Sequence, residues 1–259
     1  MSSHFEAIGF AVREMRDYWA LAHQAARAGE RIGTAPGREL FKWALGGGPE
    51  VWAQLDEAGE PASATPFFAS DDTYRIAITG TGAADDDEFE GWVDGWLNPT
   101  EEDEPLSGVF PLRVDLVNYP VVRPLLRQGQ VMAIRLAVIL FEVSLYPDVE
   151  AYRAVQTLSY RPPVPSFTSS LHFGIDEPEP EAEATALITG LVEEAREQTN
   201  PATGVAFWSL RVATTAGTLP LTAARETLPV EPRAGQVLSG SGWVLGELLP
   251  RINSSSTRL

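Results

Sequence analysis

Two segments of this 259-residue chain share one pattern, and that pattern constrains the fold more than any other feature. Residues 91–99 and residues 242–250 both read Gly-Trp-Val-x-Gly-x-Leu-x-Pro. Each segment closes a stretch rich in alternating apolar and polar residues, which is typical of β-strands. The sequence therefore predicts two β-rich blocks, residues 50–99 and 205–250, related by an internal duplication.

Alternation of apolar and polar residues also predicts the strands of the first half. These strands are expected at residues 51–55, 73–79, 89–97 and 110–117. Residues 56–66 are rich in turn-forming residues and are expected to form a loop. Residues 131–146 are long, apolar and rich in β-branched side chains. We interpret this run as a strand, with a buried helix as the alternative.

Three segments are predicted to be helical. Apolar residues at three- and four-residue steps predict an amphipathic helix over residues 5–27. A second, short helix is expected over residues 38–45, before three consecutive glycines at residues 46–48. Asp148 is expected to cap a helix that runs to about residue 160. The acidic, proline-containing residues 177–183 are the clearest linker.

Four strands are predicted in the C-terminal block, at residues 184–199, 205–216, 218–228 and 236–249. Gly190 would let the first strand bend and serve both sides of a small closed barrel, an OB-like layout. Such barrels commonly place a helix between their third and fourth strands, but residues 229–232 read Pro-Val-Glu-Pro. The spacing of apolar residues over 184–199 also fits a helix, which stays the alternative there.

The predicted fold class is α+β and rich in β. It has two small antiparallel β blocks, of which the C-terminal one is an OB-like barrel, together with an N-terminal helix and one mid-chain helix. The predicted domains are residues 1–165, with the first β block, and residues 166–250, with the second. Residues 251–259 are expected to be a disordered tail.

The C-terminal block also carries a set of glycines, threonines and aromatic residues with fixed spacing. They are Ala186, Thr189, Gly190, Val192, Thr199, Asn200, Thr203, Gly204, Phe207, Trp208, Thr214, Gly217, Gly240, Gly242, Trp243 and Gly246. On these residues the block resembles an uncharacterised family of bacterial proteins of unknown function. The resemblance implies a shared architecture and brings no activity, ligand or site.

Composition excludes several kinds of chemistry and partner. The formal net charge is −17, which disfavours nucleic acids and anionic membrane surfaces. The absence of cysteine excludes disulfides, thiol nucleophiles and cysteine-bound zinc. The start of the chain lacks signal-peptide character, and no apolar run approaches the ~20 residues of a membrane span. We expect a cytoplasmic protein without a cofactor, whose partner is a protein or a small molecule.

Catalytic candidates are few. The chain has three histidines, and His172 follows a run of serine and threonine, but no Gly-x-Ser-x-Gly motif accompanies it. If the protein is a hydrolase-type enzyme, we expect His172 to act with the carboxylates of Asp94 and Glu247. The acidic residues 85–88 and 101–104 offer oxygen ligands for a divalent cation, but they lack EF-hand spacing, so no metal site is predicted.

Aromatic residues are the candidates for ligand binding. Trp92, Asp94 and Trp96 would share one face of a strand, and Trp243 would share a face with Glu247. Such faces could recognise a sugar or a basic peptide, although buried tryptophan is more often structural. The three glycines at residues 46–48 have a helix before them and a strand after them, the reverse of a phosphate loop. The favoured function is a non-catalytic binding or interaction protein, with the enzyme and the cation-binding protein as alternatives.

Overall fold

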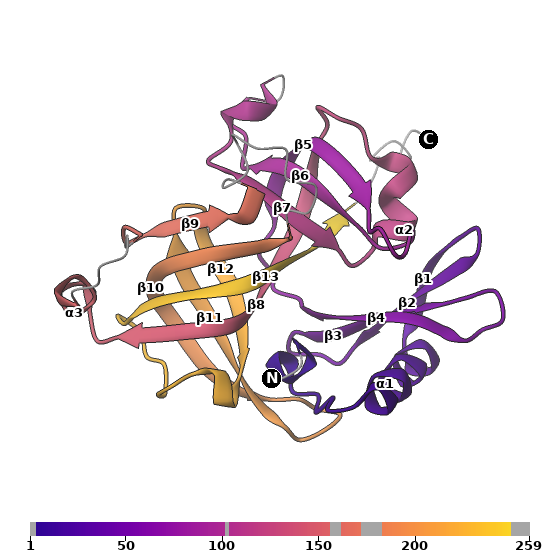
Figure 1. Cartoon of the computed structure of the whole chain (residues 1–259), viewed down its shortest axis with the longest axis horizontal. Helices are drawn as coiled ribbons and strands as arrows, with labels where there is room; N and C mark the ends of the chain where they lie inside the picture. Colours follow the sequence, from indigo (N-terminus) through magenta and orange to yellow (C-terminus); the bar gives the residue numbers. More distant parts are fainter. Residues whose placement is uncertain (1–3, 102–103, 156–161, 172–182, 250–259) are drawn as a thin grey trace, which may run out of the picture.

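The computed structural model describes residues 4–101, 104–155, 162–171 and 183–249, and most of these residues lie in two β-sheets (Figure 1). The smaller sheet is antiparallel and has four strands in chain order. They are β1 (Glu30–Ala35), β2 (Arg38–Ala44), β3 (Pro49–Leu55) and β4 (Pro61–Phe68). The larger sheet contains β5 (Tyr74–Ala83), β6 (Gly91–Leu97), β7 (Pro111–Leu116), β8 (Val131–Tyr146), β9 (Ser166–Ser169), β10 (Thr185–Thr199), β11 (Ala206–Thr214), β12 (Gly217–Ala224) and β13 (Val237–Leu249).

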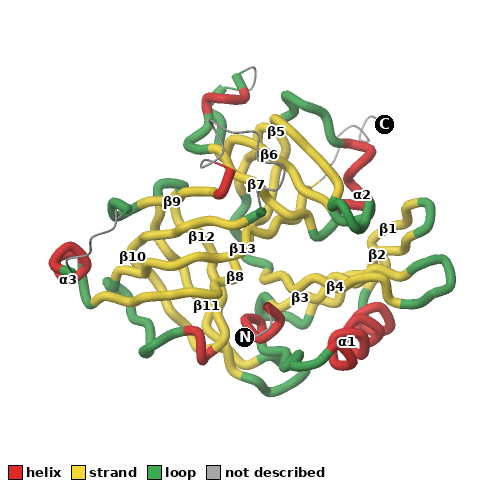
Figure 2. Tube along the Cα trace, in the orientation of Figure 1, coloured by secondary structure: helices red, strands yellow, loops and turns green. Residues whose placement is uncertain are grey.

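Helices are short and few, as Figure 2 shows in red. The helical segments whose bounds lie within the described residues are η1 (His4–Ile8), α1 (Met15–Ala28), η2 (Pro105–Ser107), α2 (Tyr119–Val122), η3 (Arg123–Leu125), α3 (Val149–Ala154) and η5 (Arg225–Thr227). The β-rich α+β class predicted from the sequence is therefore confirmed. Within the described residues, no helix has the length and apolar character that crossing a membrane requires.

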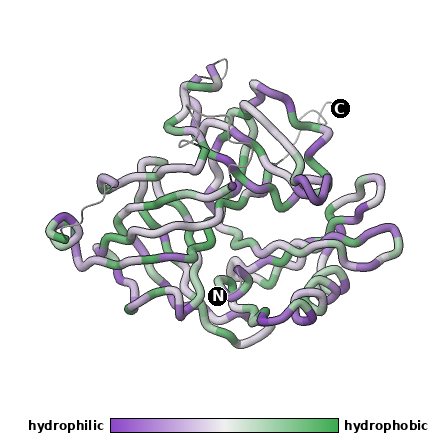
Figure 3. Tube along the Cα trace, viewed as in Figure 1, coloured by the Kyte–Doolittle hydropathy of each residue, from purple (hydrophilic) through white to green (hydrophobic). Residues whose placement is uncertain are grey.

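The N-terminal helix begins ten residues later than predicted. Gly9 has a φ of +80°, and a side chain there would lie 2.6 Å from Cβ of Asn200, so the chain turns at this point. The helix α1 then starts at Met15, where the carboxylate of Asp17 accepts the backbone N–H of Glu14 at 3.2 Å. Figure 3 shows hydrophobic and hydrophilic residues interleaved along α1, whose apolar face packs on the small sheet.

Two predictions in this region are wrong. Residues 38–44, expected to be helical, form the strand β2, which hydrogen-bonds to β1 on one side and to β3 on the other. Most of residues 56–66, expected to be a loop, belong to β4 at the edge of the sheet. An edge strand tolerates Pro61 and Pro66, which had indicated a loop. In both cases pairing between strands overrides local propensity.

The strands of the large sheet pair in two closed circuits. We call β5-β6-β7-β13-β8 the first ring and β10-β11-β12-β8-β13 the second ring. Every pairing is antiparallel except β7 with β13 and β12 with β8, which are parallel. The long strands β8 and β13 lie side by side and belong to both rings (Figure 1).

This sharing changes the expected C-terminal block in one respect. The four strands predicted there form β10 to β13, and residues 184–199 are a strand rather than a helix. The fifth strand of the ring, however, is β8, which the predicted domain boundary at residue 165 assigns to the first half. The ladder between β8 and β13 therefore joins the two predicted domains within one sheet.

The two rings repeat one pairing pattern. The strands β5 to β8 pair in the same order as β10 to β13, and the fourth strand of each set serves as the fifth strand of the other. The matching Gly-Trp-Val segments do not occupy equivalent places in this pattern, because residues 91–97 form β6 and residues 242–249 lie in β13. The equivalent strands β5 and β10 instead share Ile-Thr-Gly, at residues 78–80 and 188–190.

Buried side chains form two clusters. One fills the rings and includes Ile76, Ile134 and Leu210. The other lies where η1, α1 and the small sheet cover the outer face of β8 and β13, and it includes Trp52 and Ile139. The small sheet therefore covers the strands that the two rings share, and the functional candidates lie around this junction and at the ring ends.

Candidate functional site

The predicted aromatic strip on β6 exists, but the chain itself covers part of it. Trp92, Asp94 and Trp96 lie on one face and are partly buried, while Gly91, Val93, Gly95 and Leu97 on the other face are buried. The guanidinium carbon of Arg113 lies 3.6 Å from the centre of the Trp92 ring. Two nitrogens of Arg113 donate to the two carboxylate oxygens of Asp94, at 2.8 and 2.9 Å. Arg113 thus occupies the place that a cationic ligand would take on Trp92.

The second predicted aromatic, Trp243 on β13, is held by Asp115 on β7. The indole Nε1 donates to a carboxylate oxygen of Asp115 at 2.6 Å. The pKa of Asp115 is raised to about 6, chiefly by burial and in smaller part by the charge of Glu90, while the bond from Trp243 and the charge of Arg113 oppose the rise. Trp243 is therefore a partly buried structural residue with an unusual carboxyl partner.

Glu247, a predicted catalytic residue, lies in a buried ionic cluster. One carboxylate oxygen is 3.5 Å from Nζ of Lys42, and the other is 2.6 Å from a nitrogen of Arg135. Lys42 is the only lysine of the chain, and its Nζ also lies 2.9 Å from Glu50, which accepts the indole N–H of Trp52. Desolvation raises the pKa of Glu50, and Lys42 opposes the rise. The cluster joins the small sheet to β8 and β13, which is a structural role.

The other residues singled out from the sequence are His172 and the two acidic segments. His172 lies outside the described residues, as does part of the acidic segment 101–104. In the other acidic segment, Asp87 accepts the backbone N–H of Phe89 and pairs with Arg38. Over the described ranges, no three or more His, Asp or Glu side chains gather in a way that could hold a metal ion.

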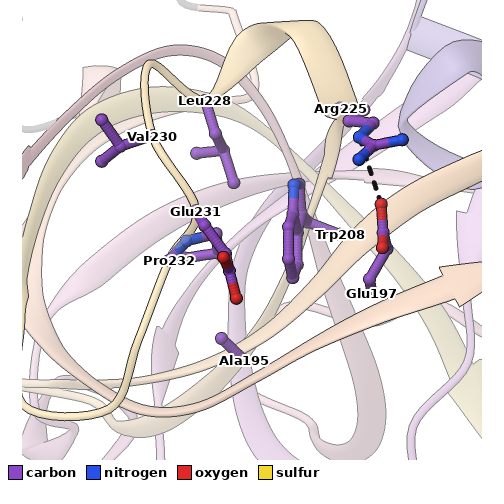
Figure 4. Close-up of a pocket in the computed structure, with 8 residues that line it drawn as sticks. All are labelled: Ala195, Glu197, Trp208, Arg225, Leu228, Val230, Glu231 and Pro232. Carbon is purple, nitrogen blue, oxygen red and sulfur yellow. Dashed lines mark ion pairs between the residues drawn. The ribbon is translucent and has the colours of Figure 1, made fainter.

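A pocket that the sequence did not single out lies at one end of the second ring (Figure 4). Its volume is about 470 Å³, within the range of small ligand sites. Its walls come from β10, β11, η5 and the segment that follows η5. The lining residues are Ala195, Glu197, Trp208, Arg225, Leu228, Val230, Glu231 and Pro232.

The pocket exists because the connection that covers this end of the second ring is short. In the first ring, α2 and η3 connect the third and fourth strands, and Tyr119, Val122 and Leu126 from this connection are buried in the core. The corresponding connection of the second ring has only η5, which buries no residue, followed by Pro-Val-Glu-Pro. Leu228 packs into the core, and space remains above Trp208.

The pocket has an apolar floor and charged sides. Trp208 stands at its centre and is 9% exposed, with Glu197 and Arg225 on one side and Glu231 on the other (Figure 4). Arg225 Nε lies 3.1 Å from a carboxylate oxygen of Glu197. Val230, at the rim, is 55% exposed. The polar groups of the lining are the carboxylates of Glu197 and Glu231 and the guanidinium group of Arg225.

Comparisons with known proteins give no further information on identity. No protein-family model, no curated protein and no solved structure matches this chain. The resemblance of the C-terminal block to an uncharacterised bacterial family therefore stays a prediction, and the site must be interpreted from its own residues.

Sequence reasoning passed over Trp208, although one signal pointed to it. Trp208 was one of several tryptophans on predicted strands, and large aromatics on strands are usually core residues. The informative feature was the missing helix between the third and fourth strands of the C-terminal block. A ring whose end is not covered by a helix leaves that end open. Trp208 lies near this end of β11 and lines the pocket, whereas its neighbour Phe207 packs in the other cluster.

Proposed function

We propose that this chain is a non-catalytic binding protein, and that its pocket at Trp208 takes an apolar side chain next to a basic residue of a partner protein. The observation that carries the proposal is the arrangement in Figure 4, an indole floor between carboxylates. We also propose that the protein is cytoplasmic. We propose further that its two rings arose by an internal duplication, and the repeated pairing pattern of the rings supports this.

The chemistry of the pocket supports this kind of partner. Tryptophan and arginine are enriched among the residues that dominate binding energy in protein interfaces. An apolar side chain would cover Trp208 and Val230, while a neighbouring cation would meet the carboxylate of Glu231 in place of the exposed Arg233, which lies 3.6 Å from it. The net charge of −17 would attract a basic partner over a longer range and speed its association at low salt.

The enzyme alternative has less support within the described structure. Asp94 and Glu247 are each held in ion pairs with arginine, and neither lines the pocket at Trp208. The cation-binding alternative relies on acidic segments of which one, residues 85–88, is engaged in contacts with Arg38 and Arg123.

An array of acetylated pentapeptides tests the proposal. The probes combine one Leu, Met or Phe with one or two Arg in a Gly-Ser background, and matched probes carry Glu instead of Arg. We expect binding only to the basic peptides with an apolar residue. Calorimetry on the best peptide should show weaker binding at higher salt, because exposed charges are screened.

Two valine variants provide a matched pair. Val230 lines the pocket, whereas Val205 is similarly apolar, 38% exposed and outside it. Val230→Ala should weaken peptide binding and Val205→Ala should not. Glu231→Gln should weaken it by up to about fivefold, the usual effect of an exposed ion pair. Equal affinities for the two valine variants, or equal binding of acidic and basic peptides, would refute the proposal.

A further inference from the structure

A second cavity of about 540 Å³ lies between the three-glycine loop and the outer face of β10, β11 and β12. We call it the glycine-loop groove. One wall consists of Gly47, Gly48 and the residues from Phe68, the last residue of β4, to Asp71. The opposite wall presents polar side chains of β10 and β11. None of its residues belongs to the pocket at Trp208.

The strand wall is a regular array of hydrogen-bonding groups. In the antiparallel ladder of β10 and β11, Glu194 lies opposite Arg211 and Arg196 lies opposite Ser209. Gln198 follows on the same face of β10 and lines the groove next to the glycine loop. Cross-strand neighbours on one face are about 5 Å apart, so donors and acceptors alternate at short intervals.

The charges of the groove are already paired within the chain. Arg211 donates to both carboxylate oxygens of Asp72, and Arg196 pairs with Glu194. With Asp71 included, three carboxylates face two guanidinium groups, which disfavours an anion. A guanidinium group has five N–H donors and a carboxylate about four acceptor sites, so each pair keeps spare hydrogen-bonding capacity. A neutral ligand with many hydroxyl groups can use that capacity without breaking the pairs.

The glycine loop adds backbone donors. Gly46 and Gly47 have φ values of +78° and +70°, which favour glycine. No side chain packs against them, because a Cβ at Gly46 would meet nothing within 4 Å and one at Gly47 only Gln198 Oε1 at 3.9 Å. Within the described part of the chain, the N–H groups of Gly47 and Gly48 have no hydrogen-bond acceptor. At Gly47 and Gly48 the backbone of the loop lines the groove.

We propose that the glycine-loop groove is a binding site for a neutral saccharide. The sugar hydroxyls bond to the paired side chains of β10 and β11, to Gln198 and to the N–H groups of the glycine loop. The site is separate from the pocket at Trp208 and does not depend on the function proposed for it.

The test is saturation-transfer NMR with an array of neutral mono- to tetrasaccharides, with glucose 6-phosphate and glutamate as charged probes. We expect saturation transfer to at least one neutral sugar and none to the charged probes. Absence of transfer to every neutral sugar would overturn the proposal, and so would stronger binding of glucose 6-phosphate.

Two glycine variants separate binding from backbone strain. Gly46→Ala and Gly47→Ala impose similar strain, because the two φ values are similar and both sites are open, but only Gly47 lines the groove. Gln198→Ala removes a side-chain donor and acceptor, so it should weaken sugar binding about fivefold, as expected for one lost hydrogen bond. Gly47→Ala keeps the backbone N–H but places a methyl group in the groove, so it should weaken sugar binding by obstructing the approach of the sugar to that N–H. Gly46→Ala, and Val230→Ala in the other pocket, should leave it unchanged. Equal losses in the two glycine variants would contradict the proposed contact.

Discussion

Replacing Asp115 with asparagine should make the protein more stable at neutral pH. The carboxyl group of Asp115 is largely buried on β7 and accepts the indole N–H of Trp243 at 2.6 Å. Burial raises its pKa from the ordinary value of 3.8 to about 6. Between these two pH values the folded protein binds a proton that the unfolded chain does not bind, so its stability rises as the pH falls.

The magnitude follows from the two pKa values. A pKa of about 6 instead of 3.8 corresponds to about 3 kcal/mol of lost stability at pH values well above 6. The loss disappears only well below pH 3.8, where the carboxyl is neutral in both states. Asparagine is neutral at every pH, and its Oδ1 can still accept the N–H of Trp243. Asp115→Asn should therefore gain about 1–3 kcal/mol at pH 7.5 and no more than about 0.5 kcal/mol at pH 4.

Urea unfolding of the wild type and of Asp115→Asn at pH 4 and pH 7.5 measures this difference directly. The exposed Asp85 provides a control, because Asp85→Asn should change stability little and equally at both pH values. The reasoning is refuted if Asp115→Asn is less stable than the wild type at pH 7.5, or if its effect is the same at both pH values.

Three further predictions concern the junction, the N-terminal turn and the acidic segment 85–88. Lys42→Met should destabilise the protein by about 3–5 kcal/mol in urea unfolding, because it leaves Glu50 and one oxygen of Glu247 buried without their ammonium partner; a loss under 1 kcal/mol would show that the cluster is not structural. Gly9→Ala should cost at least about 1–3 kcal/mol by the same assay, because it combines a positive φ with a contact of 2.6 Å; wild-type stability would mean that the turn relaxes freely. Millimolar calcium should leave the melting temperature unchanged, since residues 87 and 88 already pair with arginines; a rise in melting temperature would revive the cation-binding alternative.

The strands of the large sheet could be predicted because their alternation is local. Residues 131–146 and 184–199 both form strands, and their β-branched and alternating residues indicated this despite a helical alternative. The residues of β2 were expected to be helical because Leu40, Phe41 and Trp43 give no sign that the segment pairs with a strand on each side. Pairing partners far apart in the sequence decide such segments, and no local pattern records them.

The two Gly-Trp-Val segments lie in strands that are not equivalent in the pairing pattern of the rings. Gly-Trp-Val is a conspicuous match, but glycine and tryptophan at alternating positions suit any strand that packs closely on a neighbour. Ile-Thr-Gly at residues 78–80 and 188–190 is a weaker match, yet it lies near the point where β5 and β10 each change partner. The sharing of β8 and β13 by the two rings could not be predicted from local sequence, because each set of four consecutive strands takes its fifth strand from the other set.

In the candidate site, too, the features set by local sequence could be predicted, and those set by pairing between distant strands could not. The shared face of Trp92, Asp94 and Trp96 was predicted correctly from the period of a strand. That Arg113 fills this face depends on the register between β6 and β7, which places Arg113 opposite Asp94. The pocket at Trp208 depends on the length of one connection, which the sequence showed as an absence of helix rather than as a motif.

The most direct test of the binding function is ¹⁹F NMR of the protein labelled with 5-fluorotryptophan. The chain has seven tryptophans, and Trp208→Phe assigns the resonance of Trp208. Titration with the best basic, apolar-anchored pentapeptide should shift the Trp208 resonance saturably and leave those of Trp52 and Trp92 in place. Saturable binding that moves other resonances while Trp208 stays still, or no binding by any peptide of the array, would contradict the account.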